Sequence, residues 1–403
     1  MKILLASVGT YGDVGPLVSY GRELRKSGHE VCLCTTAEWS ALAERHGLDT
    51  LPLPTSVSRM LASNADVMGS PLRATPRLLR DLCSLSESMF DPLRAVAARF
   101  DRIVGSGAQL AGVTVAEGIG LPYVHLLHAP SWFPSGRHTP PAFPFQSASP
   151  TVNAALWRLF TAAFHRATSS VVNRQRATFG LRPVADVYES FRSVAVVCQD
   201  ATLGPVPGDC GSVRCVPYLE APHEDGGLPP ELEAFLDRGP RPVFVGFGSM
   251  PERQTGVLDR VHTALREVGA RVIYQVGASA RAPSSDARTF VLRRRVAHSL
   301  LFPRVRACIH HGGAGTTYSI ARAGVPQIVM PQLLDQFYWG QRVHDLGLGP
   351  RPLSFTRPGR RALRGAMASV LQDARFDAEA QRSARRITPS GGSQLSALLG
   401  IHA

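Results

Sequence analysis

The residues with the clearest chemical potential form one short segment, His310-His311-Gly312-Gly313-Ala314-Gly315-Thr316-Thr317. It stands between an apolar run that predicts a strand and a run that predicts a helix. Glycines let the backbone approach a ligand, and the first turn of a helix offers unpaired N–H groups and the positive end of its dipole. Two hydroxyl groups and the imidazole of His311 add hydrogen bonds. The segment predicts an anion-binding site; a glycine-rich turn with core histidines is the alternative.

Two common phosphate-binding motifs do not fit the chain. No Lys follows the glycines of 312–315, which excludes a Walker A loop. The G-x-G-x-x-G pattern of dinucleotide-binding proteins is absent there, and Gly246-Phe247-Gly248 lacks the third glycine. The anion site therefore belongs to another class.

Asp13 is the first candidate for a general base. It lies in the predicted loop after the first strand, at the edge where open parallel sheets bind their ligands. The alternative is an Asp that caps the following helix. His125 and His128 could reach an acceptor pocket or be satisfied core histidines, and both interpretations stay open.

Metal chemistry finds little support. No Asp-x-Asp pair occurs anywhere in the chain, and no Cys or His stands at zinc-ligand spacing. The seven cysteines contain no C-x-x-C pair and are expected to be reduced thiols. We expect neither a metal nor a cofactor.

These residues need parallel sheets to position them. Residues 2–8 predict a buried strand, 9–15 a loop, 16–27 a helix with Pro16 in its first turn and Gly28 as its stop, and 30–36 a second strand. The alternation of predicted strands and helices continues, with further strands predicted around 102–104 and 122–127. Residues 131–150 predict a long surface loop.

A change of composition divides the chain. Residues 203–242 are rich in Gly, Pro and acidic side chains, and a second α/β series follows. Its predicted strands are 242–247, 271–276, 289–292, 307–310 and 327–330, and its predicted helices are 255–268 and 316–323. We predict an N-terminal domain over 1–215, a linker over 216–240 and a C-terminal domain with terminal helices over 241–403.

Composition excludes several other classes. A chain of 403 residues with 44% hydrophobic and 19% charged residues predicts two folded domains. The net charge is +13, but the basic residues are scattered and no basic and aromatic module accompanies them, which argues against nucleic acid. No apolar run reaches the length of a membrane span, and the start has no cleavage site. The cytoplasm is the expected location.

Several segments together resemble a known family. His311 to Thr317, Ala323-Gly324-Val325-Pro326 and Pro331 to Gln336 are similar to the donor-binding signature of family-1, nucleotide-sugar-dependent glycosyltransferases of the GT-B fold. Phe247-Gly248-Ser249, His298 before Leu301-Phe302-Pro303, and the first loop Gly9 to Val14 also fit. The likeness is greatest to bacterial antibiotic glycosyltransferases and to sterol glucosyltransferases, and it covers 1–36 and 241–350.

The resemblance implies a fold and a set of roles. The fold is two Rossmann-like domains facing across a cleft. The donor diphosphate would be held by Ser249, His311, Gly313, Ala314, Gly315 and Thr316, the nucleobase would face Val296 and Ala297, and the sugar would meet Asp335 and Gln336. Asp13 would be the base. Acceptor contacts would include Tyr11, His125, His128, Trp132 and Phe133. Without the resemblance, Asp335 predicts a helix N-cap.

The implied reaction is inverting transfer of a hexose or deoxyhexose from a UDP- or dTDP-sugar to a hydroxyl of a small molecule, first of all a bacterial secondary metabolite. A sterol or lipid acceptor is the alternative within the family. A nucleotide-sugar epimerase and a non-catalytic glycosyltransferase-like partner are the alternatives of other classes. The sequence does not determine the sugar, the nucleobase of the donor, the acceptor or the oligomeric state.

Overall fold

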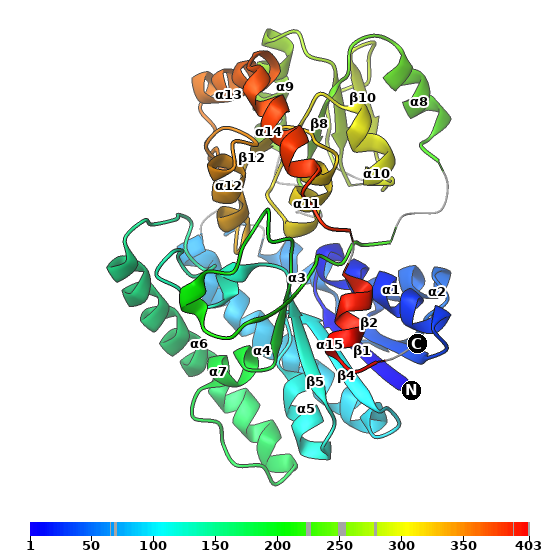
Figure 1. Ribbon diagram of the computed structural model, residues 1–403, viewed down its shortest axis with the longest axis vertical. Helices are drawn as coiled ribbons and strands as arrows, with labels where there is room; N and C mark the ends of the chain where they lie inside the picture. Colours follow the sequence, from blue (N-terminus) through cyan, green and yellow to red (C-terminus); the bar gives the residue numbers. More distant parts are fainter. Residues whose placement is uncertain are drawn as a thin grey trace.

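A computed structural model describes residues 1–64, 66–67, 71–222, 227–248, 255–277, 280–389 and 391–401, with the backbone alone for 71, 72 and 255. Two lobes lie one above the other, and each is built on its own parallel sheet (Figure 1). Ser249 falls outside the described residues. The predicted α/β fold with two Rossmann-like domains is confirmed.

The first lobe carries a seven-stranded parallel sheet in the order β3-β2-β1-β4-β5-β6-β7. Its strands are β1 (Lys2–Val8), β2 (Glu30–Thr36), β3 (Asp49–Leu53), β4 (Arg102–Gly107), β5 (Tyr123–Leu127), β6 (Ala195–Cys198) and β7 (Arg214–Val216). Its helices are α1 (Tyr11–Lys26), α2 (Ala37–Arg45), α3 (Val57–Ser63), α4 (Pro71–Ala97), α5 (Ala111–Ile119), α6 (Pro150–Thr178) and α7 (Val187–Arg192). Helices flank the sheet, so its strands read as near-continuous apolar runs.

The second lobe carries a five-stranded parallel sheet in the order β10-β9-β8-β11-β12. Its strands are β8 (Val243–Gly246), β9 (Val272–Gln275), β10 (Thr289–Leu292), β11 (Ala307–His310) and β12 (Gln327–Val329). The helices that follow β7 are α8 (Pro230–Asp237), α9 (Thr255–Glu267), α10 (His298–Leu301), α11 (Ala314–Arg322), α12 (Gln336–Asp345), α13 (Arg360–Gln372), α14 (Ala374–Ala384) and α15 (Gly392–Leu398).

The strand order reverses once in each sheet, between β1 and β4 and between β8 and β11. At such a switch point the loops after neighbouring strands diverge and leave a crevice at the carboxyl ends, where open α/β sheets bind their ligands. Topology therefore places two segments at the crevices: the one after β1, where the first turn of α1 carries Asp13, and the loop after β11, which carries His311.

The start of α1 corrects one prediction. The helix begins at Tyr11 and not at Pro16, so Pro16 is its sixth residue and lies beyond the first turn. The cause is a capping box, in which the N3 residue Asp13 accepts a hydrogen bond from the backbone N–H of the N-cap residue Thr10 (2.8 Å). Gly28 follows the C-cap residue of α1 with a φ of +84° and stops the helix, as predicted.

The chain around the lobe boundary is more structured than a linker. Helix α8 lies inside the segment 216–240 and packs on the second lobe through Leu232 and Phe235. The last helix, α15, leaves the second lobe and packs beside α1 of the first (Figure 1). Leu395 is fully buried in the core of the first lobe, and the hydroxyls of Tyr20 and Ser396 are 3.0 Å apart. The domain boundaries at 215 and 240 stay a prediction.

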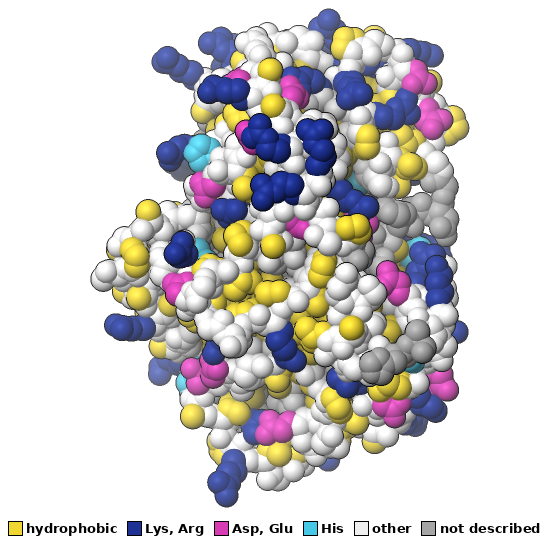
Figure 2. All heavy atoms as spheres, in the orientation of Figure 1, with side chains coloured by type: hydrophobic (Ala, Val, Ile, Leu, Met, Phe, Trp, Pro, Cys, Tyr) yellow, Lys and Arg dark blue, Asp and Glu magenta, His cyan; other side chains and the backbone are white. Residues whose placement is uncertain are grey.

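Basic and acidic side chains are interspersed over both lobes on the face that Figure 2 shows. The seven cysteines, all among the described residues, are free thiols. Within the described ranges, no helix is long and apolar enough to cross a membrane.

The return of α15 generates a stability prediction. Leu395→Ala should lower the free energy of unfolding by about 2–5 kcal/mol, because it opens a cavity in the core of the first lobe. The neighbouring exposed residue gives a matched control, since Gln394→Ala should stay within about 0.5 kcal/mol of the wild type. Urea unfolding checks both. Equal, small effects of the two substitutions would mean that α15 does not stay docked in solution.

Candidate active site

One large cavity joins the two crevices. It has a volume of about 1090 Å³ and is lined from both lobes. The first lobe contributes residues 9–13 after β1, which include the first turn of α1, residues 107–110 at the end of β4 and His128 after β5. The second contributes residues 246–248 at the end of β8, 293–299 and 313–316. A ligand in it would touch both lobes.

The second-lobe end of the cavity is built around His311. A Cβ added at Gly313 would lie 2.5 Å from His311 Nε2, and one added at Gly248 would lie 3.1 Å from its Cε1. Gly248 and Gly312 also have φ values of +71° and +86°. Glycine is thus required here both for conformation and for space.

The first turn of α11 leaves backbone donors available. Thr317 is the first residue whose N–H has a helical partner, Gly313 O at 2.9 Å. The N–H groups of Ala314, Gly315 and Thr316 have no backbone partner in the described part of the chain. They are the donors that a helix N-terminus presents to an anion.

The two adjacent histidines differ in role. His310 is a core residue, fully buried, with Nε2 2.9 Å from Gln327 Oε1 and Nδ1 accepting from Gly312 N–H at 3.2 Å. His311 lines the cavity, and its Nδ1 has no partner among the described residues. Burial lowers the pKa of His311 to about 4, so the ring is neutral at pH 7. The structural alternative for this segment therefore fits His310 alone.

Asp13 caps α1 and lines the cavity at the same time. Its Oδ2 accepts from the N–H of Thr10 (2.8 Å) and from the Thr10 hydroxyl (3.1 Å). The described residues supply no hydrogen bond to Oδ1. Burial raises the pKa of Asp13, which makes the carboxylate a stronger base. The capping and general-base interpretations are compatible, because each uses a different oxygen.

Asp335 and Gln336 lie at the start of α12 and line the same cavity. Asp335 is at the N-cap position, but its side chain makes no capping bond and accepts instead from Trp339 Nε1–H at 3.1 Å. Gln336 Oε1 accepts from the N–H groups of Gln332 (2.8 Å) and Leu333 (3.2 Å). Burial, with a contribution from the charge of Asp13, raises the pKa of Asp335 to about 7. Asp335 is thus the N-cap residue of α12, as predicted, but its side chain does not cap the helix.

Comparisons with known proteins fit this geometry. Residues 3–124 match the glycosyltransferase family 28 N-terminal domain, and residues 259–390 match the erythromycin biosynthesis protein CIII-like C-terminal domain. Vancomycin aglycone glucosyltransferase of Amycolatopsis orientalis is 33% identical over 87% of this chain and 85% of its own length. The dTDP-epi-vancosaminyltransferase of the same organism is 31% identical with the same coverage.

The chain belongs to the antibiotic glycosyltransferases. The fold agrees: the solved structure of a spinosyn rhamnosyltransferase complexed with thymidine diphosphate superposes with a TM-score of 0.70, at 20% identity, over 99% of this chain and 100% of the other.

In this glycosyltransferase, the predicted donor-side residues converge on the cavity. Val296 and Ala297 line it, as do His311, Gly313, Ala314, Gly315, Thr316, Asp335 and Gln336. Their roles toward a ligand stay predictions.

The predicted acceptor residues divide into two groups. Tyr11, His128 and Trp132 line the cavity. His125 and Phe133 are not among the lining residues: both are buried, and the rings of His125 and Phe191 pack 4.4 Å apart. His125 Nδ1 lies 2.9 Å from the Tyr123 hydroxyl, which fits the core interpretation. A role for these two in contacting an acceptor finds no support in the geometry.

The cavity also contains residues that the sequence did not single out. Its first-lobe end has an apolar wall of Leu61, Leu78, Leu79, Leu82, Leu85, Phe160, Phe164 and Phe191. At its edge, the guanidinium carbon of Arg295 lies 3.8 Å from the centroid of the Tyr11 ring and 5.7 Å from that of Trp39, a cation–π contact between the lobes. Tyr218 lines the cavity from the segment after β7. Tyr218 falls in the segment 216–240 that the sequence predicts as a linker.

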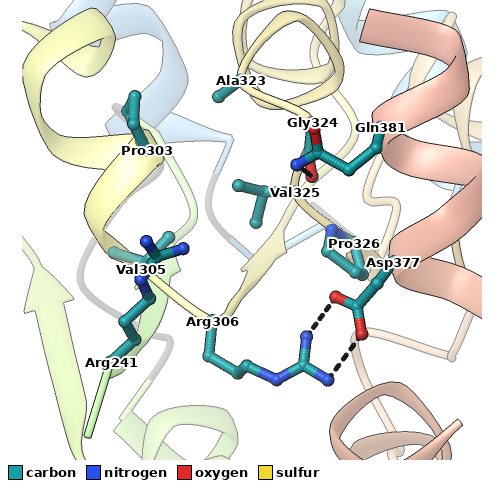
Figure 3. Close-up of a pocket in the computed structure, with 10 residues that line it drawn as sticks. All are labelled: Arg241, Pro303, Val305, Arg306, Ala323, Gly324, Val325, Pro326, Asp377 and Gln381. Carbon is teal, nitrogen blue, oxygen red and sulfur yellow. Dashed lines mark hydrogen bonds and ion pairs between the residues drawn. The ribbon is translucent and has the colours of Figure 1, made fainter. Parts of the chain in front are cut away.

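A second, smaller hollow of about 270 Å³ has a different character (Figure 3). Arg306 pairs there with Asp377 of α14, and Gln381 Nε2–H donates to Gly324 O at 3.0 Å. Arg241 and Arg306 precede β8 and β11, so this hollow lies at the amino ends of the strands, opposite the edge that binds ligands. It anchors α14 and takes no part in the candidate site.

The half-buried carboxyl group of Asp335 generates a pH prediction. Between its ordinary pKa of 3.8 and about 7, the folded chain holds a proton that the unfolded chain has lost, so this group's contribution to stability declines as pH rises through that window. Asp335→Asn should therefore stabilise the unliganded protein by about 1–3 kcal/mol at pH 8 and much less at pH 5. Urea unfolding at both pH values checks this, with Asp345→Asn on the exposed end of α12 as the control. A stabilisation that is equal at the two pH values would contradict the assignment.

Proposed function

We propose that this glycosyltransferase transfers a hexose or deoxyhexose, with inversion, from a nucleoside-diphosphate sugar to a hydroxyl of a sizeable apolar small molecule, in the biosynthesis of a bacterial secondary metabolite. One observation carries the proposal: a single cavity joins an anion-binding helix terminus to an apolar wall, and the half-buried carboxylate of Asp13 lines it. The names of the two Amycolatopsis relatives support it, and one of these names includes a dTDP-linked sugar.

The donor would lie against the second lobe. The N–H groups of Ala314, Gly315 and Thr316 and the imidazole of His311 would hold the diphosphate, with Ser249 and the backbone of Gly313. Fixed donors stabilise the charge that forms on a leaving group, and they act strongly where water is excluded. Val296 and Ala297 would face the nucleobase, and Asp335 and Gln336 the sugar hydroxyls. Thymidine and uridine diphosphates are both candidates.

The acceptor would lie against the first lobe. The leucine and phenylalanine side chains at that end would cover an apolar ring system, while Tyr11, His128 and Trp132 would contact its edges. Burial lowers the pKa of His128 to about 4, so its ring would act as a neutral hydrogen-bonding group. Its Nδ1 has no partner among the described residues.

The reaction follows from this placement. The acceptor oxygen forms a bond to the anomeric carbon while the bond from that carbon to the diphosphate oxygen breaks, and the electron pair leaves with the diphosphate. Asp13 Oδ1 takes the proton of the acceptor hydroxyl, and Thr10 keeps the other oxygen in place. Base and leaving group belong to opposite lobes, which suits attack from the side opposite the diphosphate and hence inversion.

Replacing Asp13 tests the proposal. Asp13→Asn should lower kcat by roughly 10² to 10⁴, because the amide keeps an acceptor for Thr10 N–H but cannot take the proton. The assay follows release of nucleoside diphosphate from dTDP- and UDP-sugars with a panel of aromatic, macrocyclic and sterol acceptors. Nucleotide affinity should change less than threefold.

A second capping residue supplies the control for Asp13. Asp186 caps α7 by accepting from Tyr188 N–H (2.8 Å) and Glu189 N–H (3.1 Å), and it does not line the cavity. Asp186→Asn should leave kcat unchanged. If both variants keep full activity, Asp13 is only a cap. Sugar release that needs no acceptor would indicate an epimerase or hydrolase instead, and no turnover with any donor would indicate a non-catalytic partner.

Metal independence is a separate expectation of the proposal. The chain has no Asp-x-Asp pair, and in the part that the structure describes no three His, Cys, Asp or Glu side chains group as metal ligands would. The first turn of α11 and His311 would then stabilise the diphosphate without a cation. Transfer should persist after exhaustive treatment with EDTA. Activity that is abolished and then restored by Mg²⁺ or Mn²⁺ would overturn this part of the proposal.

A further inference from the structure

Tyr218 brings a hydroxyl group from the first lobe to the first turn of α11. The residue follows β7 and is 4% exposed. Its ring packs against the ring of Tyr318 in α11, with centroids 4.4 Å apart, and meets the His128 ring edge-on at 6.0 Å. The ring is therefore held between the two lobes.

The hydroxyl end of this ring points at Gly315. A Cβ added at Gly315 would lie 2.6 Å from Tyr218 Oη but 3.7 Å from Cζ, so the phenol oxygen is the closest atom to that position. Gly315 is the second residue of α11, and its N–H is one of the three without a backbone partner in the described chain. The tyrosine hydroxyl and the available backbone donors thus meet at one point of the cavity.

Tyr218 as a residue is almost fully buried, it lines the cavity, and its hydroxyl has no hydrogen bond to any described residue. A tyrosine hydroxyl in such a place usually has a hydrogen-bond partner. Burial raises the pKa of Tyr218, so the group keeps its proton and is a neutral donor at any working pH. A donor that converges with backbone N–H groups is suited to an oxygen anion with several acceptor positions.

We propose that Tyr218 donates a hydrogen bond to the terminal phosphate of the nucleoside diphosphate as it leaves. This makes it a catalytic residue supplied by the first lobe to a site otherwise built by the second. The proposal rests on the proposed function, since it assumes that the diphosphate occupies the first turn of α11. It adds a donor that neither the glycine-rich segment nor the resemblance contains.

The surroundings hold Tyr218 in place for this role. Its carbonyl oxygen accepts from Gly391 N–H at 3.0 Å, and Glu220, two residues on, forms an ion pair with Arg322 of α11. The carbonyl of Tyr218 is therefore fixed by the N-cap residue of α15, and the segment just after it is tied to α11 of the second lobe. The hydroxyl is positioned before the ligand arrives, so little ordering is needed in the transition state.

Tyr218→Phe tests the assignment, because phenylalanine keeps the ring and removes only the hydroxyl. A lost hydrogen bond to a charged group predicts about 10- to 100-fold weaker binding of dTDP or UDP, measured by calorimetry. Binding of dTMP or UMP, which lack the terminal phosphate, should change less than twofold. kcat should fall by a similar 10- to 100-fold.

Tyr318→Phe is the matched control. The Tyr318 hydroxyl donates to Thr388 O at 2.7 Å, outside the cavity, while the Tyr318 ring packs against the ring of Tyr218. This variant should bind nucleoside diphosphates as the wild type does. An equal loss in both variants would show that ring packing, and not the Tyr218 hydroxyl, is responsible, and would overturn the proposal.

The remaining outcomes are also decisive. Unchanged diphosphate affinity and unchanged kcat in Tyr218→Phe would refute the assignment. A change confined to the KM of the nucleotide-sugar would place the hydroxyl on the sugar and refute the phosphate contact. If the wild type itself binds no nucleoside diphosphate, the proposed function fails, which is distinct from a failure of Tyr218 alone.

A double-mutant cycle on stability tests the geometry without any ligand. Gly315→Ala should destabilise the wild type, because the new Cβ would meet Tyr218 Oη. The same substitution should cost less in the Tyr218→Phe background, where that oxygen is absent. Equal costs in the two backgrounds would show that the hydroxyl does not lie against Gly315 and would remove the basis of the proposal.

Discussion

The close packing of backbone around the His311 imidazole constrains the rest of the site. The ring fits only because Gly248 and Gly313 carry no side chains, and α11 starts directly beneath it. The first three N–H groups of α11 then have no backbone partner in the described part of the chain. A polar surface of this kind is costly in a closed protein unless a ligand or water completes it. The glycines thus make space for an anion beside backbone N–H groups that need a hydrogen-bond acceptor.

The acidic side chains of the cavity complement these backbone donors. The ends of the two sheets bring Asp13 and Asp335 into one cavity, and burial disfavours the ionised form of each. Binding one more negative group there is favourable only where donors outnumber acceptors, which is at α11. The carboxylates therefore suit the neutral, hydroxyl-bearing part of a substrate. Donors line one side of the cavity and acceptors the other. A nucleotide-sugar therefore fits in one orientation, with its diphosphate at α11 and its hydroxyl groups at the carboxylates.

Local signals predicted most of the strands, but not β3, β6 and β7. The predicted bounds of β1, β2, β10 and β11 match the structure to the residue, whereas α11, predicted over 316–323, begins two residues earlier, at Ala314. The start of α1 was misplaced because Pro16 was taken as a first-turn signal, although Thr10 and Asp13 already had the spacing of a capping box. His125 and His128 were separable in principle, because the predicted strand ended at residue 127 and only His128 lies beyond it.

Residues that act across the lobe boundary carried no local signal. Tyr218 and Arg295 come from a segment without periodicity and from a loop, and their neighbours in space, Gly315 and Tyr11, are far away in the sequence. Such contacts depend on how two independently folded sheets face each other, and no hydrophobic pattern encodes that. The same chain, however, returns α15 to the first lobe and pairs Glu220 with Arg322, so the relative position of the lobes is held by several separate contacts. The lobe arrangement is thus itself part of the site, because a hydroxyl supplied from one lobe reaches a helix terminus of the other only while those contacts hold.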